Sequence, residues 1–249
     1  MSFIKNNIPN AVTCCNLICG CIAAGAAFNY NLQTALLFII FGAVFDFFDG
    51  MTARALHVSS PIGKELDSLA DCVTFGVAPS AMLFTVMTQV QYPSFIPVSW
   101  KAFLPFTAFI MAAFSALRLA KFNLDTRQTT SFIGLPTPAN ALFWGALIVG
   151  AKDFLVSQHF NILLLIFLML IFSYTLVAEI PMFSLKVKNL SWEDNKVRYT
   201  FLAVSIVLIA WLKIPGIAAA IAWYIVLSVL LNYVTVTPPT YGNKDNYNK

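Results

Sequence analysis

The chain has 249 residues, of which 59% are hydrophobic and only 10% are charged. Soluble domains contain about 25% charged residues, so this composition cannot supply a water-exposed surface. It excludes a soluble globular protein and predicts an integral membrane protein. The formal net charge of +4 is too small and too dispersed along the chain to indicate nucleic-acid binding.

Uncharged stretches long enough to cross about 30 Å of hydrocarbon recur along the whole sequence. They predict an all-α bundle of about eight transmembrane helices, organised as one membrane-embedded domain over residues 1–249. A Pro-Gly turn between Lys213 and Gly216 predicts that the last two spans form a helical hairpin. The predicted spans cover residues 11–29, 33–54, 67–89, 101–121, 138–152, 159–179, 199–212 and 216–235.

The distribution of basic residues predicts the orientation of these spans. An N-terminus in the cytoplasm places 12 of the 15 lysines and arginines on or near the cytoplasmic side, and leaves Lys101, Lys152 and Lys213 on the other. This asymmetry agrees with the positive-inside rule. An even number of spans returns the polar tail, residues 237–249, to the cytoplasm. We therefore expect a multi-pass protein of the cell membrane with both termini cytoplasmic.

Small residues cluster in the first and the eighth predicted spans, where residues 20–27 and 216–220 are rich in glycine and alanine. Small side chains allow helices in a membrane to approach closely. The sequence leaves two arrangements open: packing within one chain, and a seam between the subunits of a homodimer.

Four aspartates flank the turn between the second and third predicted spans. Asp46 and Asp49 are three residues apart, and Asp67 and Asp71 are four apart, so each pair lies on one helix face. A carboxylate in or near hydrocarbon costs about 2.5–3.5 kcal/mol, so the cluster requires a compensating cation. Oxygen ligands without nearby histidine or cysteine favour Mg²⁺, Mn²⁺ or Ca²⁺ over zinc. Four carboxylates are enough for two ions that assist phosphoryl-type transfer.

The residues between the aspartates indicate what this site binds. Gly50 and Ala53 leave the helix surface bare, so a flat or bulky group can approach the backbone. Arg54 offers a planar fork for a phosphate, and Gly63 lies at the turn into the next helix.

Residues 46–71 read DFFDGMTARALHVSSPIGKELDSLAD, a DxxDGxxAR segment followed after eight residues by GxxxDxxxD. This pattern resembles the signature of the CDP-alcohol phosphotransferases, integral membrane enzymes that transfer a phosphatidyl or phospho-alcohol group from a CDP-linked donor. The segments at 9–20, 63–79, 117–123 and 132–140 resemble the phosphatidylserine synthase branch of that family. Lys121 stands where related sequences would have arginine.

The resemblance implies a reaction and a role for each matching residue. The implied donor is CDP-diacylglycerol, the acceptor is L-serine, and the products are phosphatidylserine and CMP. Asp46, Asp49, Asp67 and Asp71 would hold the metal ions, and Asp71 would also act as general base towards the serine hydroxyl. The cytidine and its phosphates would bind at the residues that follow the second aspartate, namely Gly50, Ala53 and Arg54, and Gly63 would permit the close turn.

Three further polar residues are candidate substrate-binding residues. Asn16 lies at helical spacing from Asn10 and Thr13 at the start of the first span, within reach of the cytidine or the metal ligands. Arg118 and Lys121 lie one turn apart at the cytoplasmic end of the fourth span. They could bind the donor phosphate or the serine carboxylate, or they could simply anchor the helix at the membrane surface.

Alternative functions remain open at this stage. Within the family, glycerol 3-phosphate or inositol phosphate could replace serine as the acceptor. A cation-binding membrane transporter would use the aspartates as an ion path, but spans five to eight carry almost no carboxylates. A prenyltransferase also uses aspartate-rich helices, but its motifs lack the DGxxAR segment.

Overall fold

The computed structural model describes the chain except for residues 1, 59, 126–131, 184–190 and 237–249, so the predicted polar tail lies outside the described residues. The described part is almost entirely helical. In chain order its elements are α1 (Ser2–Phe28), α2 (Leu32–Leu56), α3 (Pro61–Asp71), the π-helix η1 (Cys72–Val77), α4 (Ala78–Met87), α5 (Val98–Lys101), the 3₁₀ helix η2 (Leu104–Ala108), α6 (Phe109–Leu124), β1 (Phe132–Ile133), α7 (Thr137–Gly150), α8 (Lys152–Leu155), α9 (Ile162–Val177), β2 (Pro181–Met182), α10 (Trp192–Leu212) and α11 (Ile214–Val236).

The predicted all-α membrane architecture is confirmed, but the predicted number of eight spans is not. Within the described residues, six helices are long and apolar enough to cross a membrane. The fifth and sixth predicted spans correspond to α7 and α9, which have only 14 and 16 residues. At 1.5 Å per residue they extend about 21 and 24 Å, less than the hydrocarbon thickness of about 30 Å.

The third predicted span begins earlier than its apolar run suggests. It starts at Pro61 rather than at residue 67 and continues through α3, η1 and α4 to Met87. Ser60 caps this helix, because its hydroxyl accepts a hydrogen bond of 2.9 Å from the backbone N–H of Gly63. A serine cap followed by proline in the first turn is a common helix start. Asp67 and Asp71 therefore lie well inside a helix.

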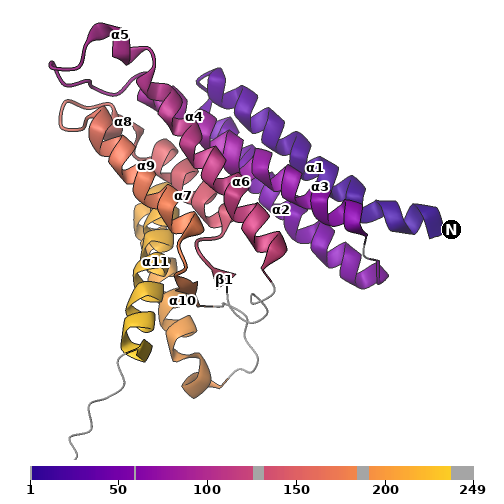
Figure 1. Ribbon diagram of the computed structural model, residues 1–249. Helices are drawn as coiled ribbons and strands as arrows, with labels where there is room; N and C mark the ends of the chain where they lie inside the picture. The colour runs from indigo at the N-terminus through magenta and orange to yellow at the C-terminus, as the bar shows by residue number, and fades with distance from the viewer. Residues whose placement is uncertain (1, 59, 126–131, 184–190, 237–249) are drawn as a thin grey trace, which may run out of the picture.

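The N-terminal helices form one side of the molecule, where α1 runs beside α2 and α3 (Figure 1). The core lies between these helices and α4, α6, α7 and α9. Its largest fully buried side chains include Phe75, Met82 and Trp144. This packing gives the aspartate-bearing ends of α2 and α3 a fixed support.

Small residues pack within the chain at both predicted clusters. Ala23 and Ala27 of α1 are fully buried, and a Cβ added at Gly20 would lie 2.8 Å from the Cα atom of Thr74. A Cβ at Gly42 of α2 would also collide with the Thr74 side chain. Thr74 is thus held between two close-packed glycines, which agrees with intramolecular packing of the first span.

The last two long helices form the predicted hairpin, although the turn has a different centre. α10 ends at Leu212, Lys213 adopts a left-handed φ of +57°, and α11 begins at Ile214. Gly216 therefore belongs to the first turn of α11 instead of the connection. A Cβ there would lie 2.6 Å from the Cα of Ile209, so glycine is needed for the close approach to α10. The hairpin lies against α7 (Figure 1).

A short antiparallel pair joins two connections of the bundle. β1 pairs with β2 in the register Phe132 to Met182 and Ile133 to Pro181. Gly134 follows with a φ of +77°, and its N–H donates to the backbone oxygen of Ile180 at 2.9 Å. A Cβ at Gly134 would press on the backbone of α9, so the loop before α7 is fixed to the end of that helix.

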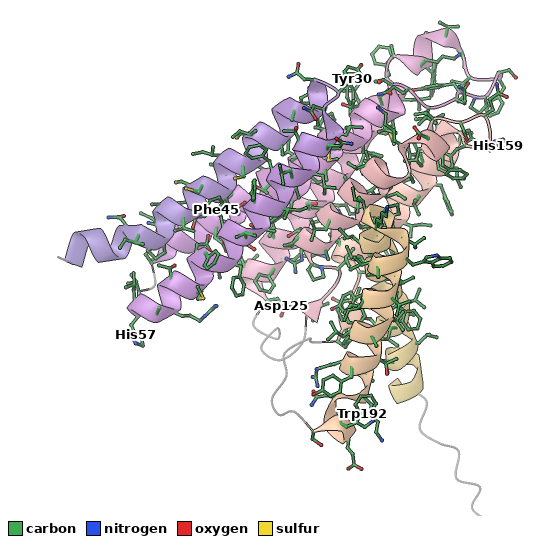
Figure 2. The ribbon with its side chains drawn as sticks, turned by 180° about the vertical axis from the view of Figure 1, so that it is seen from behind. Tyr30, Phe45, His57, Asp125, His159 and Trp192 are labelled. Carbon is green, nitrogen blue, oxygen red and sulfur yellow. The ribbon has the colours of Figure 1, made fainter. Side chains whose placement is uncertain are left out.

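The connections gather at two ends of the bundle. Figure 2 places Tyr30 and His159 at one end, and His57, Asp125 and Trp192 towards the opposite end. The α2–α3 turn, the C-terminal end of α6 and the start of α10 therefore share one side of the molecule, which we call the polar end.

We expect Gly20→Ala to lower the free energy of unfolding by about 1–3 kcal/mol, because the added methyl group would force the backbone around Thr74 to shift. Gly25→Ala in the same helix is the matched control, since nothing lies within 4 Å of its added Cβ. Thermal unfolding of both variants in one detergent measures the difference. Equal melting temperatures would show that the α1 contact is not tightly packed.

Candidate functional site

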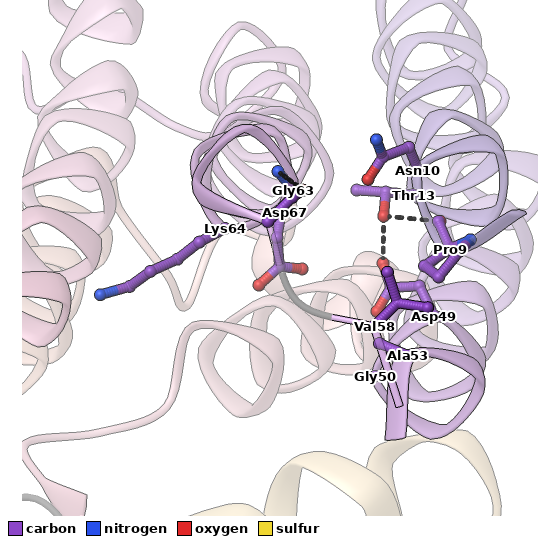
Figure 3. A pocket seen from close by; sticks show the side chains of 11 residues that line it. Pro9, Asn10, Thr13, Asp49, Gly50, Ala53, Val58, Gly63, Lys64 and Asp67 are labelled. Atoms are coloured by element: carbon purple, nitrogen blue, oxygen red, sulfur yellow. Dashed lines mark hydrogen bonds between the residues drawn. The ribbon is translucent and has the colours of Figure 1, made fainter. Parts of the chain in front are cut away.

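Three carboxylates from two helices converge at the polar end. Asp46 and Asp49 lie near the C-terminal end of α2, and Asp67 lies on α3 after the intervening turn. Each contributes one oxygen to a group whose atoms lie within 4.8 Å of one another. Figure 3 shows Asp49 and Asp67 on opposite sides of a shared pocket. The helical spacing of the aspartates therefore brings these three together.

Asp71 adjoins this group one turn further along α3. Its side chain is only 8% exposed, and the charges of Asp46, Asp49 and Asp67 all act on it. The amide Nδ2 of Asn16 donates a hydrogen bond of 3.1 Å to Asp71 Oδ1. The four predicted acidic residues thus form one electrostatic cluster, with Asp71 at its buried side.

Helix α1 supplies the neutral partners of these carboxylates. The Thr13 hydroxyl donates to Asp49 Oδ2 at 2.7 Å and lies 3.0 Å from the backbone oxygen of Pro9 (Figure 3). Asn16, one turn later on the same face, is fully buried and bonds Asp71. One face of α1 therefore orients one carboxylate from each aspartate pair. The spacing of Thr13 and Asn16 was visible in the sequence, but their partners were not.

A π-helical turn follows Asp71 directly. In η1 the Thr74 hydroxyl donates to the backbone oxygen of Asn16 at 3.0 Å, and both residues are fully buried. Single π-turns inside α-helices often occur at functional sites. This turn fixes the position of Asn16, and through Asn16 that of Asp71.

The pocket beside the acidic cluster has a volume of about 220 Å³ and opens towards the polar end. Three of the predicted substrate-binding residues, Gly50, Ala53 and Gly63, line this pocket, and their small side chains leave its walls bare. Arg54 does not line it; the side chain is exposed and its guanidinium lies 3.5 Å from where a Cβ on Gly50 would be. The complete lining is Pro9, Asn10, Thr13, Asp49, Gly50, Ala53, Val58, Ser60, Gly63, Lys64 and Asp67.

Sequence reasoning missed several wall residues of this pocket, including Pro9, Val58, Ser60 and Lys64. Ser60 could have been found, because a serine followed by proline indicates a helix start at the turn. Val58 carries no such signal, since an apolar residue in a turn has many explanations.

The donor set fits a hard divalent cation. All the converging ligand atoms are carboxylate oxygens, which suit magnesium or calcium-like ions better than soft metals. Asp67 Oδ1 is buried without a hydrogen-bond partner among the described residues, and so is Asn16 Oδ1. Buried oxygens of this kind are costly unless a cation or donor satisfies them. The acidic group could therefore bind a metal ion.

The predicted basic residues lie on α6, outside the first pocket. Arg118 is only 7% exposed, and its guanidinium lies over the Phe122 ring, 5.2 Å from the ring centre. Its charge interacts with that of Asp71, which connects it with the acidic cluster. Lys121 is exposed and lines a second, smaller pocket together with Arg118.

Comparison with known proteins identifies a matching family and several similar enzymes. A model of the CDP-alcohol phosphatidyltransferase family matches residues 6–185. The chain is 41% identical over 137 residues to the CDP-diacylglycerol–serine O-phosphatidyltransferase of Bacillus subtilis, covering 53% of this chain and 70% of that one. It is 30% identical over 231 residues to the Mycobacterium bovis enzyme of that name, covering 90% and 74%. The Saccharomyces cerevisiae enzyme is 37% identical over 118 residues, covering 44% and 39%.

We expect Asn16→Ala to destabilise the protein by about 1–3 kcal/mol, because it leaves the buried Asp71 without its amide donor. Asn29→Ala is the matched control, since Asn29 makes its side-chain bond to Gly25 at an exposed position. Thermal unfolding in detergent with a metal chelator present compares the two. A loss no larger for Asn16→Ala than for the control would contradict the importance of this bond.

Proposed function

This chain belongs to the CDP-alcohol phosphatidyltransferase family, and we propose that it transfers the phosphatidyl group of CDP-diacylglycerol to L-serine, forming phosphatidylserine and CMP. The observation that carries this proposal is the oxygen-only cluster of Asp46, Asp49 and Asp67 beside a pocket with small-residue walls. Such a site suits a diphosphate held through metal ions. The names of the similar enzymes supply the acceptor.

We assign the four aspartates to two divalent ions, Mg²⁺ or Mn²⁺. When bound, such ions neutralise the diphosphate charge and stabilise the departing phosphate. Thr13 holds Asp49 in place and Asn16 holds Asp71, so the ligands are oriented before the substrate enters. This arrangement reduces the reorganisation needed to receive a highly charged nucleotide.

The pocket walls take the nucleotide end of the donor. Gly50, Ala53 and Gly63 let the cytidine and its phosphates approach the backbone of α2 and α3. Arg54 is exposed at the end of α2, where it can contact a phosphate that extends beyond the pocket. The diacylglycerol chains remain on the membrane side of the bundle.

Asp71 acts as the general base in this assignment. It accepts the proton of the serine hydroxyl while the serine oxygen bonds to the phosphorus that bears the diacylglycerol. The bond between that phosphorus and the diphosphate bridging oxygen breaks, and CMP leaves with the electron pair. The charge of Arg118, which acts on Asp71, is placed to hold an anionic group of the acceptor near this base.

We further propose that the polar end faces the cytoplasm, in agreement with the positive-inside rule, and that the chain acts as one catalytic unit in the cell membrane. A cytoplasmic site gives a water-soluble acceptor direct access from the cytoplasm. Gly20 of α1 and Gly216 of α11 pack within the chain, so the small residues do not support the homodimer that the sequence left open.

One assay tests the acceptor. Purified protein with CDP-diacylglycerol and Mg²⁺ or Mn²⁺ is offered serine, glycerol 3-phosphate, inositol phosphate or water in parallel, and CMP release and lipid product are measured. We expect phosphatidylserine to form fastest. Faster formation of phosphatidylglycerophosphate would assign the chain to another branch of the family, while no CMP release with any acceptor would contradict the proposed phosphatidyl transfer.

We expect each of the variants Asp46→Asn, Asp49→Asn, Asp67→Asn and Asp71→Asn to lower turnover by about 100-fold or more, because the amide keeps the shape but loses the charge. Chelation of divalent metal should abolish wild-type turnover, and added Mg²⁺ or Mn²⁺ should restore it. Asp153→Asn in α8 is the control, since Asp153 lies outside the acidic group. A variant with near-native turnover would remove that aspartate from the site.

A further inference from the structure

An apolar pocket lies between α7 and the α10–α11 hairpin, on the side of the bundle away from α1 (Figure 1). We call it the hairpin pocket. Its volume is about 380 Å³, and it shares no lining residue with either pocket of the polar end. Aliphatic side chains of all three helices form its wall, among them Leu142, Ile209 and Ile221. The reaction assigned above does not use this space.

The three helices are in close contact near the turn of the hairpin, which closes one end of the pocket. A Cβ added at Gly216 of α11 would lie 2.6 Å from the Cα of Ile209 on α10. A Cβ added at Gly150, at the end of α7, would collide with the ring of Pro215. The hairpin pocket therefore lies between this closed end and the polar end, where Pro136 and Phe183 line it.

Three aromatic rings line the hairpin pocket towards the polar end. The ring centroids of Phe183, Phe201 and Tyr224 lie 4.8–5.7 Å apart. The Tyr224 hydroxyl donates a hydrogen bond of 2.9 Å to the backbone oxygen of Phe183, which directly follows β2. Aromatic residues with a satisfied polar tip gather where a membrane meets water. These rings therefore mark the membrane interface at this end of the pocket.

Ser205 is a buried hydroxyl without a partner in this apolar wall. It lies one helical turn beyond Phe201 on α10, and its side chain is 93% buried, since only 7% is exposed. Its Oγ makes no hydrogen bond within the described part of the chain. The hydroxyl of Tyr224, which also lines the pocket, is already bonded to Phe183. Hydrocarbon offers no water as a substitute, so the occupant of the pocket must bring an acceptor to Ser205.

The wall and its one free hydroxyl together select the class of occupant. Protein interiors do not leave a gap of this size open, and an aliphatic wall suits a hydrocarbon chain. One helical turn is about 5.4 Å, so Ser205 lies just below the interfacial rings, at the depth of the ester carbonyls of a phospholipid. No charged side chain belongs to the described lining, so nothing there selects a particular headgroup.

We propose that the hairpin pocket binds one acyl chain of a bilayer glycerophospholipid other than the donor, with an ester carbonyl accepting a hydrogen bond from Ser205. The donor is excluded because its nucleotide end is assigned to the first pocket, which α1, α2 and α3 form on the other side of the bundle. The bound chain fills the space between α7 and the hairpin. It therefore stabilises the attachment of α10 and α11 to the rest of the protein.

The test measures the binding of dioleoyl phosphatidylcholine to the purified full-length chain by native mass spectrometry. Ala220→Phe places a ring in the hairpin pocket, because Ala220 lines it. Val226→Phe is the matched control, since Val226 is exposed on the same helix and lies outside the lining. We expect wild type and Val226→Phe to retain one lipid per chain with equal affinity, and Ala220→Phe to bind it about 10-fold more weakly. Equal affinity of all three proteins would overturn the inference.

A second comparison tests Ser205 without adding bulk. The ether-linked analogue of the same lipid has no ester carbonyl, so the wild type should bind it about 5–10-fold more weakly than the ester lipid. Ser205→Ala should bind the two lipids equally. A wild type without this preference, or a Ser205→Ala variant that keeps it, would overturn the role of the hydroxyl.

Kinetics with CDP-diacylglycerol separate a bilayer lipid from the donor. We expect the KM for CDP-diacylglycerol to be the same in wild type, Ala220→Phe and Val226→Phe. A KM raised about 10-fold in Ala220→Phe alone would mean that the donor's own acyl chain occupies the hairpin pocket. That result would overturn the inference, while phosphatidylserine formation by the wild type would still support the proposed function.

Discussion

The mutual repulsion of four carboxylates at one end of an apolar bundle is the constraint on which the rest of this structure depends. Asp46, Asp49 and Asp67 bring oxygens within 4.8 Å of one another, and Asp71 is buried beside them. Hydrocarbon and neighbouring helices offer no water to screen these charges, so each requires a donor or a cation. Helix α1 supplies two neutral donors, which orient the carboxylates without cancelling their charge. The remaining negative charge could therefore bind a metal ion.

Close packing around one threonine, Thr74, connects the acidic cluster with the core. Thr74 bonds the backbone of Asn16 and is held between Gly20 of α1 and Gly42 of α2, where a larger residue would collide. The π-turn that contains Thr74 follows Asp71 without a break in the helix. The same few contacts therefore set the distance between α1, α2 and the third long helix and fix the amide that binds Asp71. The stability of the fold and the geometry of the site are therefore coupled, because a movement of any of these three helices would displace the carboxylates.

The polar end has two chemically different pockets. The first, between α1, α2 and α3, is bounded by carboxylates and small residues. The second, between α6 and α9, is lined by basic residues of α6 together with Asp125 and Glu179. Arg118 interacts with Asp71 from the second pocket.

The sequence by itself determined the membrane class, the all-α architecture, the family and the convergence of the aspartates. These properties follow from composition and from local spacing. The composition shows that the protein lies in a membrane and not in water, and residues three or four apart share one helix face. It could not decide that α7 and α9 are too short to span the membrane alone, or that α3 begins at its serine cap, because apolar runs do not mark where a helix ends. Nor could it pair Thr13 with Asp49, or bring Arg118 and Glu179 to one pocket. Such pairs join distant segments, and only the way the helices pack against one another decides which side chains meet.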